Sequence, residues 1–219
     1  VDMIASGPVS LDSSTCADAL AVAEKYALRL SDTARGLLAQ ETPKTADNVT
    51  VRVTGSVREL CAAAAKACRD LGYTPEILTD CEQGVAREVG ARLGTLAREK
   101  ASCGTPRAFI LGGETVVRLT GNGKGGRNQE LALAAAAEIA GTENVVVFSV
   151  GSDGTDGPTD AAGGLADGGT VKRLAAAGKT VADVLQNNDA YHALRDTGDL
   201  IITGPTGTNV NDFAAALVR

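Results

Sequence analysis

A glycine-rich segment at 121–130, GNGKGGRNQE, contains residue types that bind anions. Glycine lets backbone N–H groups approach a ligand without interference from a Cβ atom. The segment leads into an expected helix, and the N-terminus of a helix favours negative charge. Lys124 and Arg127 add positive charge, and the planar guanidinium of Arg127 suits a carboxylate or a phosphate. The pattern favours an anion site, and the alternative is a flexible loop with solvated cations.

This segment does not match the two best-known nucleotide-binding loops. Its GK pair is not followed by Ser or Thr, as a phosphate-binding P-loop requires. Gly121, Gly123 and Gly126 do fit the GxGxxG pattern, but they follow an expected hairpin rather than the first strand of a βαβ unit. We therefore do not interpret the segment as a dinucleotide-binding turn.

Aspartates crowd a second segment, GSDGTDGPTDAAGG at 151–164, which follows an expected buried strand. Asp153, Asp156 and Asp160 are candidates to hold Mg²⁺, which accepts oxygen ligands and bridges substrate phosphates. Aspartates in such Gly- and Pro-containing sequences also cap turns and helix starts through local hydrogen bonds. The residues alone favour neither interpretation over the other.

Neutral polar residues follow a later expected strand in TGPTGTNVND at 203–212. They either position a hydroxylated ligand or a nucleotide, or they form a tight structural turn. The candidates are Thr206, Thr208, Asn209 and Asn211. Glu114, in a GGE sequence, is either an orienting partner for Arg127 or a turn residue. IASGP at 4–8 is a further Gly-Pro turn, and His192 has no recognisable catalytic partner and is expected to be structural.

The elements that must position these residues alternate between helices and strands. Helices are expected at 17–30, 57–71, 84–101, 127–140, around 170–177 and at 189–196. Strands are expected at 49–54, 73–79, 108–111, 115–120, 145–150 and 200–203, and 212–218 is ambiguous between helix and strand. This alternation predicts an α/β fold with an at least partly parallel sheet, whose ligands bind beyond the carboxyl ends of the strands.

The composition narrows the possible functions. The net charge of −6 argues against general affinity for nucleic acid, which requires a basic surface. An odd number of cysteines, five, without a CxxC pair fits a reduced, cytoplasmic protein. No apolar run is long enough to span a bilayer, so no membrane partner is expected. The sequence begins with Val1 instead of Met, so we expect a further segment upstream of it.

Three blocks of the sequence resemble successive signature blocks of the MOFRL glycerate kinases. They are GGETVVRLTGNGKGGRNQELALA at 112–134, GSDGTDGPTDAAGG at 151–164 and ITGPTGTNVND at 202–212. Upstream, IASGPVS and ETPK resemble the end of the N-terminal domain of that family, so the resemblance covers essentially the whole chain. It implies that residues 1–106 are the C-terminal part of a Rossmann-like domain, and that 107–219 form an α/β MOFRL domain with a mixed sheet.

The resemblance also implies an activity. A kinase of this family transfers the γ-phosphoryl group of ATP to a hydroxyl of glycerate, usually giving 2-phosphoglycerate, with Mg²⁺ as cofactor. Arg127 is implied to face the substrate, and we expect Arg127 and Lys124 to be catalytic. The residues expected to bind substrate or phosphate are Gly123, Gly125, Gly126, Asn128, Glu114, Thr206, Thr208 and Asn209. The expected metal ligands are Asp153, Asp156 and Asp160.

The same resemblance leaves two alternatives open. The family site is implied to include a lysine and an acidic residue from an N-terminal half that has no counterpart here, so the chain is either part of an enzyme or a non-catalytic binding module. Some family members carry the name hydroxypyruvate reductase. A reductase using NAD(P)H needs a strand–GxGxxG–helix unit with an acidic residue about twenty positions later, and none is evident.

Overall fold

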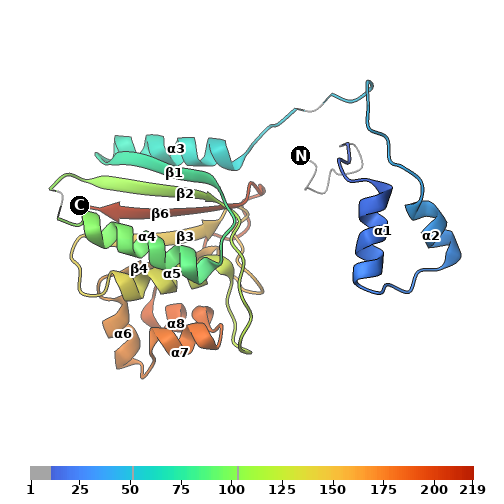
Figure 1. Ribbon diagram of the computed structural model, residues 1–219. Helices are drawn as coiled ribbons and strands as arrows, with labels where there is room; N and C mark the ends of the chain where they lie inside the picture. The colour runs from blue at the N-terminus through green and yellow to red at the C-terminus, as the bar shows by residue number, and fades with distance from the viewer. Residues whose placement is uncertain (1–10, 51, 103) are drawn as a thin grey trace. The chain divides into compact units, whose positions relative to one another are not determined.

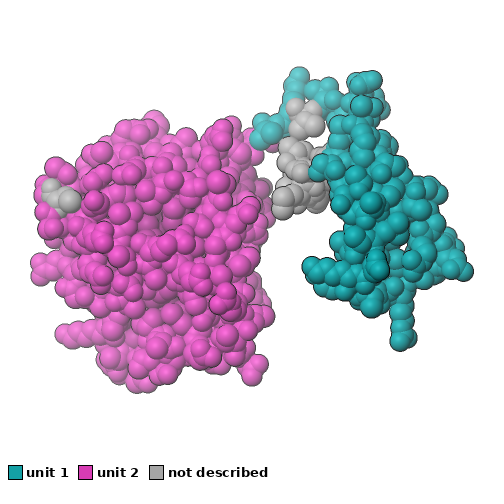
Figure 2. Space-filling model, viewed as in Figure 1, with its two compact units in different colours: residues 1–53 teal, residues 54–219 magenta. Residues whose placement is uncertain are grey.

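The computed structural model describes residues 11–50, 52–102 and 104–219. The chain divides into two compact units, Val1–Val53 and Thr54–Arg219, which are coloured separately in Figure 2. Each unit is described by itself. In the residues that the structure describes, no helix is both long and apolar enough to cross a membrane.

Unit 1 contains two short helices, α1 (Cys16–Lys25) and α2 (Asp32–Leu38). A capping box starts α1, because the Thr15 side chain accepts from the backbone of Asp18 while the Asp18 side chain accepts from the backbone of Thr15. The helix predicted at 17–30 ends five residues earlier than expected. Shortly after its end, Ala27 adopts a left-handed backbone with φ of 49°, which a helix cannot continue through.

Two other predictions fall near unit 1. The strand predicted at 49–54 is wrong for those of its residues that the structure describes, which form no strand. The Gly-Pro turn predicted at 4–8 lies outside the described residues.

Unit 2 is built on a six-stranded sheet in the order β1-β2-β6-β3-β4-β5 (Figure 1). The strands are β1 (Thr74–Glu82), β2 (Arg107–Gly113), β3 (Val145–Gly151), β4 (Gly163–Asp167), β5 (Leu200–Ile201) and β6 (Asp212–Val218). Only β1 and β2 are parallel neighbours among these, and the other four pairs are antiparallel. The predicted α/β class with a mixed sheet is confirmed.

Helices cover both faces of this sheet. They are α3 (Val57–Asp70), α4 (Ala86–Lys100), α5 (Arg127–Glu138), α6 (Thr170–Ala176), α7 (Val181–Gln186) and α8 (Ala190–Thr197). Figure 1 shows α3 on one face and α4 with α5 on the other. Neighbouring residues of β2 serve the two faces, because side chains alternate along a strand: Phe109 packs with α4 and α5, and Ile110 packs with Cys61 of α3. The thiol of Cys61 is free and buried in this contact.

Helix α5 is enclosed on several sides, which explains why its polar first turn is also buried. Against α4 it packs through small residues: a Cβ on Gly90 would lie 2.1 Å from the carbonyl oxygen of Leu131. On its other side, Leu133 joins a cluster with Leu174 of α6 and Leu194 of α8. The helix therefore fixes its N-terminal residues firmly in the unit.

The structure corrects the predicted strand at 115–120. These residues run as an extended loop in which Val116 forms a single bridge with Val85, and no hairpin follows β2. The side chains of Val116 and Leu119 are 55% and 79% exposed. Only Thr115 of this segment is buried, so the segment has no continuous buried face to stabilise a strand.

The ambiguous segment 212–218 is strand β6, which lies between β2 and β3. The predicted domain boundary between 106 and 107 falls inside unit 2, where β1 and β2 are paired on either side of it. The assignment of residues 1–106 to a Rossmann-like domain of a longer protein stays a prediction.

Candidate functional site

One edge of the sheet brings together the carboxyl ends of three strands and the start of a fourth. Gly113, at the end of β2, pairs with Asp212, the first residue of β6, and Gly151 at the end of β3 pairs with Asp212 from the other side. Glu82, at the end of β1, pairs with Gly113. Polar segments that the sequence analysis selected therefore leave the sheet at one edge, where ligands of α/β sheets bind.

Arg127 is the first residue of α5 and lies at this edge, where two carboxylates hold its guanidinium. Its Nε donates to Oδ2 of Asp212 at 2.5 Å and its Nη2 donates to Oδ1 at 3.0 Å. Its Nη1 lies 3.3 Å from Oε1 of Glu114. The hydrogen bonds to Asp212 raise the pKa of Arg127 above its ordinary value, although burial opposes them. Glu114 is therefore a partner of Arg127, one of its two predicted roles.

The guanidinium of Arg127 still has donors for a further anion. A guanidinium presents five N–H groups in one plane. Asp212 takes the side formed by Nε and Nη2, and it leaves the end formed by Nη1 and Nη2, which Glu114 approaches. The Glu114 side chain is 54% exposed and lies farther from Arg127, so it is the carboxylate that an incoming anion would displace.

The N-terminus of α5 already holds an anion, and the protein itself supplies it. Asp156 is buried and accepts from the backbone N–H of Asn128 at 3.1 Å and of Gln129 at 2.8 Å. Gly126 permits this approach, because a Cβ there would lie 2.2 Å from Cγ of Asp156. An external anion is therefore not the partner of these two amides, which corrects the prediction for this helix end.

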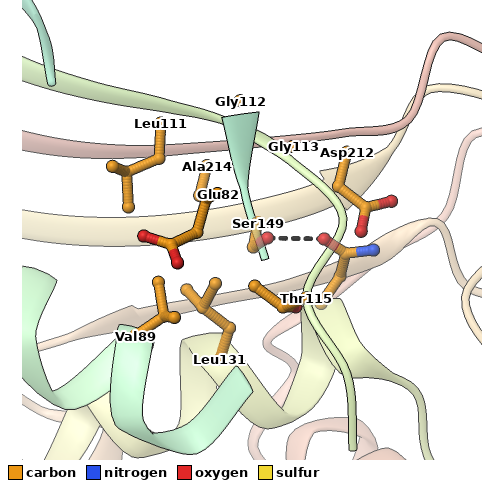
Figure 3. Close-up of a pocket in the computed structure, with 11 residues that line it drawn as sticks. Glu82, Val89, Leu111, Gly112, Gly113, Thr115, Leu131, Ser149, Asp212 and Ala214 are labelled. Atoms are coloured by element: carbon orange, nitrogen blue, oxygen red, sulfur yellow. Dashed lines mark hydrogen bonds between the residues drawn. The ribbon is translucent and has the colours of Figure 1, made fainter. Parts of the chain in front are cut away.

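A buried polar network continues from Asp156 into the sheet. Burial raises the pKa of Asp156 to about 6, although its hydrogen bonds with Gln129 and Asn128 favour the charged form. The Asn128 side chain also donates to Asp156, and it accepts from the hydroxyl of Ser149 on β3, the bond drawn in Figure 3. The first turn of α5 is thus tied to both the aspartate-rich loop and the sheet.

Asn128 and Ser149 face a small pocket under the site edge (Figure 3). Its other lining residues come from β1, α4, β2, the following loop, α5 and β6: Glu82, Val89, Leu111, Gly112, Gly113, Thr115, Leu131, Asp212 and Ala214. The lining is mostly apolar with a few polar groups, and the space is about large enough for one water molecule. It adjoins Asp212, the residue that holds Arg127.

The glycine-rich loop is packed against the turn between α7 and α8, Asn187–Asp189. The N–H of Gly123 donates to the carbonyl oxygen of Asn187 at 2.8 Å, and the N–H of Lys124 donates to Oδ1 of Asp189 at 2.9 Å. A Cβ on Gly121 would lie 2.4 Å from Cα of Asn187. Close backbone packing therefore explains these glycines, and the predicted use of the Gly123 amide for phosphate is wrong in this conformation.

Lys124 places its ammonium group over an aromatic ring instead of beside Arg127. Its Nζ lies 4.6 Å from the centre of the Tyr191 ring, a cation–π contact. The Tyr191 hydroxyl donates to Oδ1 of Asp160 at 2.7 Å, and this bond lowers the pKa of Asp160. His192, the residue after Tyr191, places its Nδ1 2.6 Å from Oδ1 of Asp189.

The predicted metal ligands do not converge. Asp156 caps α5, Asp160 contacts Tyr191, and Asp153 accepts from the backbone of Thr155 within its own turn. Within residues 11–50, 52–102 and 104–219, no group of three or more His, Cys, Asp and Glu side chains is arranged to hold a metal ion. For Asp156 the structure shows the capping role, the alternative left open by the sequence.

The polar loop before β6 is a turn attached to the aspartate-rich loop. The Thr206 hydroxyl donates to the carbonyl oxygen of Ser152, and the Thr206 N–H donates to that of Asp153. The side chains of Thr208 and Asn209 are exposed, and the Asn209 side chain accepts from the backbone of the residue two positions on. Both predicted interpretations, a structural turn and a ligand-positioning surface, are compatible with this geometry.

Sequence reasoning missed Asp212 and Asn188. The signal for Asp212 was available, because this acidic residue ends the polar segment 203–212 and directly precedes an apolar run. The ambiguity of that run hid its position at the sheet edge. Asn188 lies in a turn that no pattern selected, and its contacts join segments more than 50 residues apart.

Comparison with known proteins identifies relatives of the whole chain. Residues 107–212 match the MOFRL family. A D-glycerate 2-kinase of Thermotoga maritima is 48% identical over 100% of this chain and 53% of that protein. The crystal structure of a glycerate kinase from Thermotoga maritima matches with a TM-score of 0.90, 48% identity, and coverage of 100% of this chain and 54% of that one.

A relative from Agrobacterium vitis has the name of a hydroxypyruvate reductase, with 39% identity over 98% of this chain and 51% of that protein. The chain thus spans about half the length of these curated relatives.

Proposed function

Because the chain belongs to the MOFRL-type glycerate kinase family, we propose that it forms part of the active site of an enzyme that phosphorylates glycerate with ATP. The expected product is 2-phosphoglycerate. The observation that carries this proposal is the guanidinium of Arg127, oriented by buried Asp212 and still able to bind an anion through its outer end. Since the chain spans about half of its relatives, we propose that an N-terminal half completes the site.

Phosphoryl transfer depends mainly on positioning and on electrostatic stabilisation of charge on the transferred group. In this proposal Arg127 holds the glycerate carboxylate or the transferring phosphoryl group. Arg127 and its partners Asp212 and Glu114 together carry one net negative charge. Binding of an anion here therefore benefits from displacement of Glu114 and from a further cation, such as the lysine implied for the N-terminal half.

The other predicted residues have supporting roles in this proposal. Lys124 supports the nucleotide phosphates, and its ammonium group lies on the side of the glycine-rich loop that Tyr191 occupies. Gly125 and Gly126 remain proposed phosphate contacts. Thr206, Thr208 and Asn209 position the ligand from the loop before β6.

We propose MgATP as the phosphoryl donor. Asp153, Asp156 and Asp160 do not fit Mg²⁺ as a group, because each has a different partner and Asp156 faces the amides of α5. Mg²⁺ commonly keeps several waters and binds one or two carboxylates together with substrate phosphates. Asp153 and Asp160 therefore stay proposed single ligands, and we assign no step of the reaction to the metal.

The geometry favours a kinase over a hydroxypyruvate reductase. A dinucleotide site needs a glycine-rich turn whose amides are open to the pyrophosphate. Here the amides of Gly121 and Gly123 are bonded to the α7–α8 turn. The named reductase relative keeps the alternative testable. We propose that the enzyme acts in the cytoplasm, as its cysteine usage suggests.

One pair of assays tests the proposed function. The full-length protein is incubated with D-glycerate and MgATP, and separately with hydroxypyruvate and NADH or NADPH. We expect ADP release that depends on glycerate. Oxidation of the nicotinamide cofactor without ADP release would contradict the proposal, and the same assays on this chain alone test whether the N-terminal half is required.

A further inference from the structure

Asn188 is a buried residue that is not among the predicted site residues. It lies in the turn between α7 and α8, is 6% exposed, and has a left-handed backbone with φ of 53°. Asparagine tolerates this conformation better than most residues do. A buried amide side chain must satisfy its donors and its acceptor within the protein, so the partners of Asn188 show what the residue does.

The Asn188 amide joins the glycine-rich loop to the interior. Its Oδ1 accepts from the backbone N–H of Thr120 at 2.7 Å and of Gly121 at 2.9 Å. Its Nδ2 donates to the carbonyl oxygen of Arg118 at 3.1 Å and to Oε2 of Glu130 at 3.1 Å. One side chain thereby fixes the start of the loop that carries Lys124.

The interior side of this connection is an ion pair between a buried carboxylate and a half-buried guanidinium. Glu130, on α5, is 2% exposed and accepts from Nε of Arg87, on α4, at 2.8 Å. Nη2 of Arg87 donates in turn to the carbonyl oxygen of Leu185, at the end of α7. Glu130 and Asn188 are therefore linked by hydrogen bonds, directly or through Arg87, to groups on α4, α5 and α7. Through Asn188, the glycine-rich loop is attached to these packed helices.

We infer that Asn188 is a positioning residue for the nucleotide, acting through Lys124; this inference rests on the proposed function. Arg127 has independent support, because Asp212 holds its guanidinium at the sheet edge and Asp156 accepts from the backbone of the next residue in α5, Asn128. Among the residues that the structure describes, the Lys124 side chain contacts the Tyr191 ring and makes no hydrogen bond or ion pair. Displacement of the loop should therefore weaken nucleotide binding and leave glycerate binding nearly unchanged.

The main variant is Asn188→Gly in the full-length protein, because glycine keeps the left-handed backbone and removes only the side chain. The matched control is Asn144→Gly. Asn144 is also left-handed, with φ of 59°, but it is exposed and its side chain makes no hydrogen bond to any described residue. The two variants share the backbone change, and they differ in the loss of the loop contacts.

For Asn188→Gly we expect KM for ATP to rise about tenfold, the size typical of a lost positioning contact, with KM for glycerate within about twofold. A purely structural role would lower the active fraction and reduce kcat with both KM values unchanged, and that result would overturn the inference. In a Lys124→Met background, Asn188→Gly should add less than about twofold to KM for ATP, because the two changes act on one contact.

A second variant breaks the same contact from the loop side. Gly121→Ala leaves Asn188 intact but brings a Cβ to 2.4 Å from Cα of Asn187, so the loop must move away. It should reproduce the rise in KM for ATP. If Asn188→Gly and Gly121→Ala both fold and KM for ATP is unchanged in both, the inference is overturned.

Failure of the proposed function is distinguishable from failure of this inference. If the wild-type protein releases no ADP with glycerate, the proposed function fails. Amide hydrogen exchange then tests the inference by itself. We expect faster exchange at Thr120 and Gly121 in Asn188→Gly than in wild type or Asn144→Gly, and equal exchange would overturn it.

Discussion

Arg127 and Lys124 are cations three residues apart in one segment, yet the fold treats them differently. Arg127 is held by a buried carboxylate at the sheet edge, and its helix is capped by a second one. Lys124 lies on a half-buried loop whose backbone is hydrogen-bonded to Asp189, while its side chain contacts only the face of the Tyr191 ring among the described residues. A fixed, planar guanidinium suits an anion that binds in one orientation. An ammonium group on a flexible side chain suits an anion whose position changes.

The largest expected effect is that of Arg127→Lys in the full-length protein. Lysine keeps the charge but loses the planar fork that engages Asp212 and an anion together. We expect a loss of about 2–4 kcal/mol in transition-state stabilisation, or roughly thirtyfold to a thousandfold in kcat/KM. The check is kcat/KM for glycerate beside Tm. Near-normal kinetics in a folded variant would remove Arg127 from the site.

Asp212→Asn tests whether the orientation of Arg127 matters as well as its charge. The amide cannot accept both N–H groups, so the guanidinium loses its fixed direction. Misplacement of a positioned group can cost up to about a hundredfold, and we expect a loss on the order of tenfold to a hundredfold in kcat/KM. The matched control is Asp199→Asn, since Asp199 is also buried and also holds an arginine, Arg173, away from the site edge. Equal kinetic losses in the two variants would contradict the orienting role.

Lys124→Met should have a smaller effect. Methionine keeps the apolar stem over Tyr191 and removes the charge. We expect KM for ATP to rise by about tenfold at most, the loss of roughly one charge-assisted contact, while KM for glycerate stays the same. Lys179→Met, which removes a lysine paired with Asp196, is the control. A larger effect on glycerate than on ATP would reverse the roles of the two cations.

The smallest effect concerns the stability contributed by Asp156. Its pKa is raised to about 6 in the folded protein, so the folded state binds a proton more readily than the unfolded state. This contribution therefore decreases as pH rises, by roughly 1 kcal/mol between pH 5 and pH 7. Asp156→Asn should lose this dependence. The check is the free energy of unfolding by urea of wild type and Asp156→Asn at both pH values, and the difference between the two proteins should be smaller at pH 7 than at pH 5. A difference that is larger at pH 7 would contradict the raised pKa of Asp156.

Local patterns predicted the long elements well. Helices α3, α4 and α5 lie within a few residues of their predicted positions, because apolar periodicity and Gly72, with a left-handed φ of 85°, define them. The segments 115–120 and 212–218 were harder, since both contain short apolar runs. The first is mostly exposed and forms no strand, while the second is central in the sheet, and only long-range pairing decides between these outcomes.

The site showed the same limit. Sequence placed Arg127 at a helix start and suggested Glu114 as its partner, because both features are local. It could not show that Asp156 occupies the helix end or that the loop glycines pack against Asn187, since those contacts come from segments far away in the chain. Glycine-rich composition indicates close approach of something, and here the approaching group is the protein backbone.

The position of β6 has a consequence for synthesis. It follows every other strand of the sheet in the chain, yet it lies between β2 and β3 and pairs with both. The parallel pair β1–β2 and the antiparallel pair β3–β4 therefore have no direct contact as neighbouring strands until β6 has left the ribosome. Long-range pairing of this kind folds slowly and exposes strand edges meanwhile. Before then, the Asp212 that orients Arg127 is also absent, so the site edge and the middle of the sheet are completed by the same event.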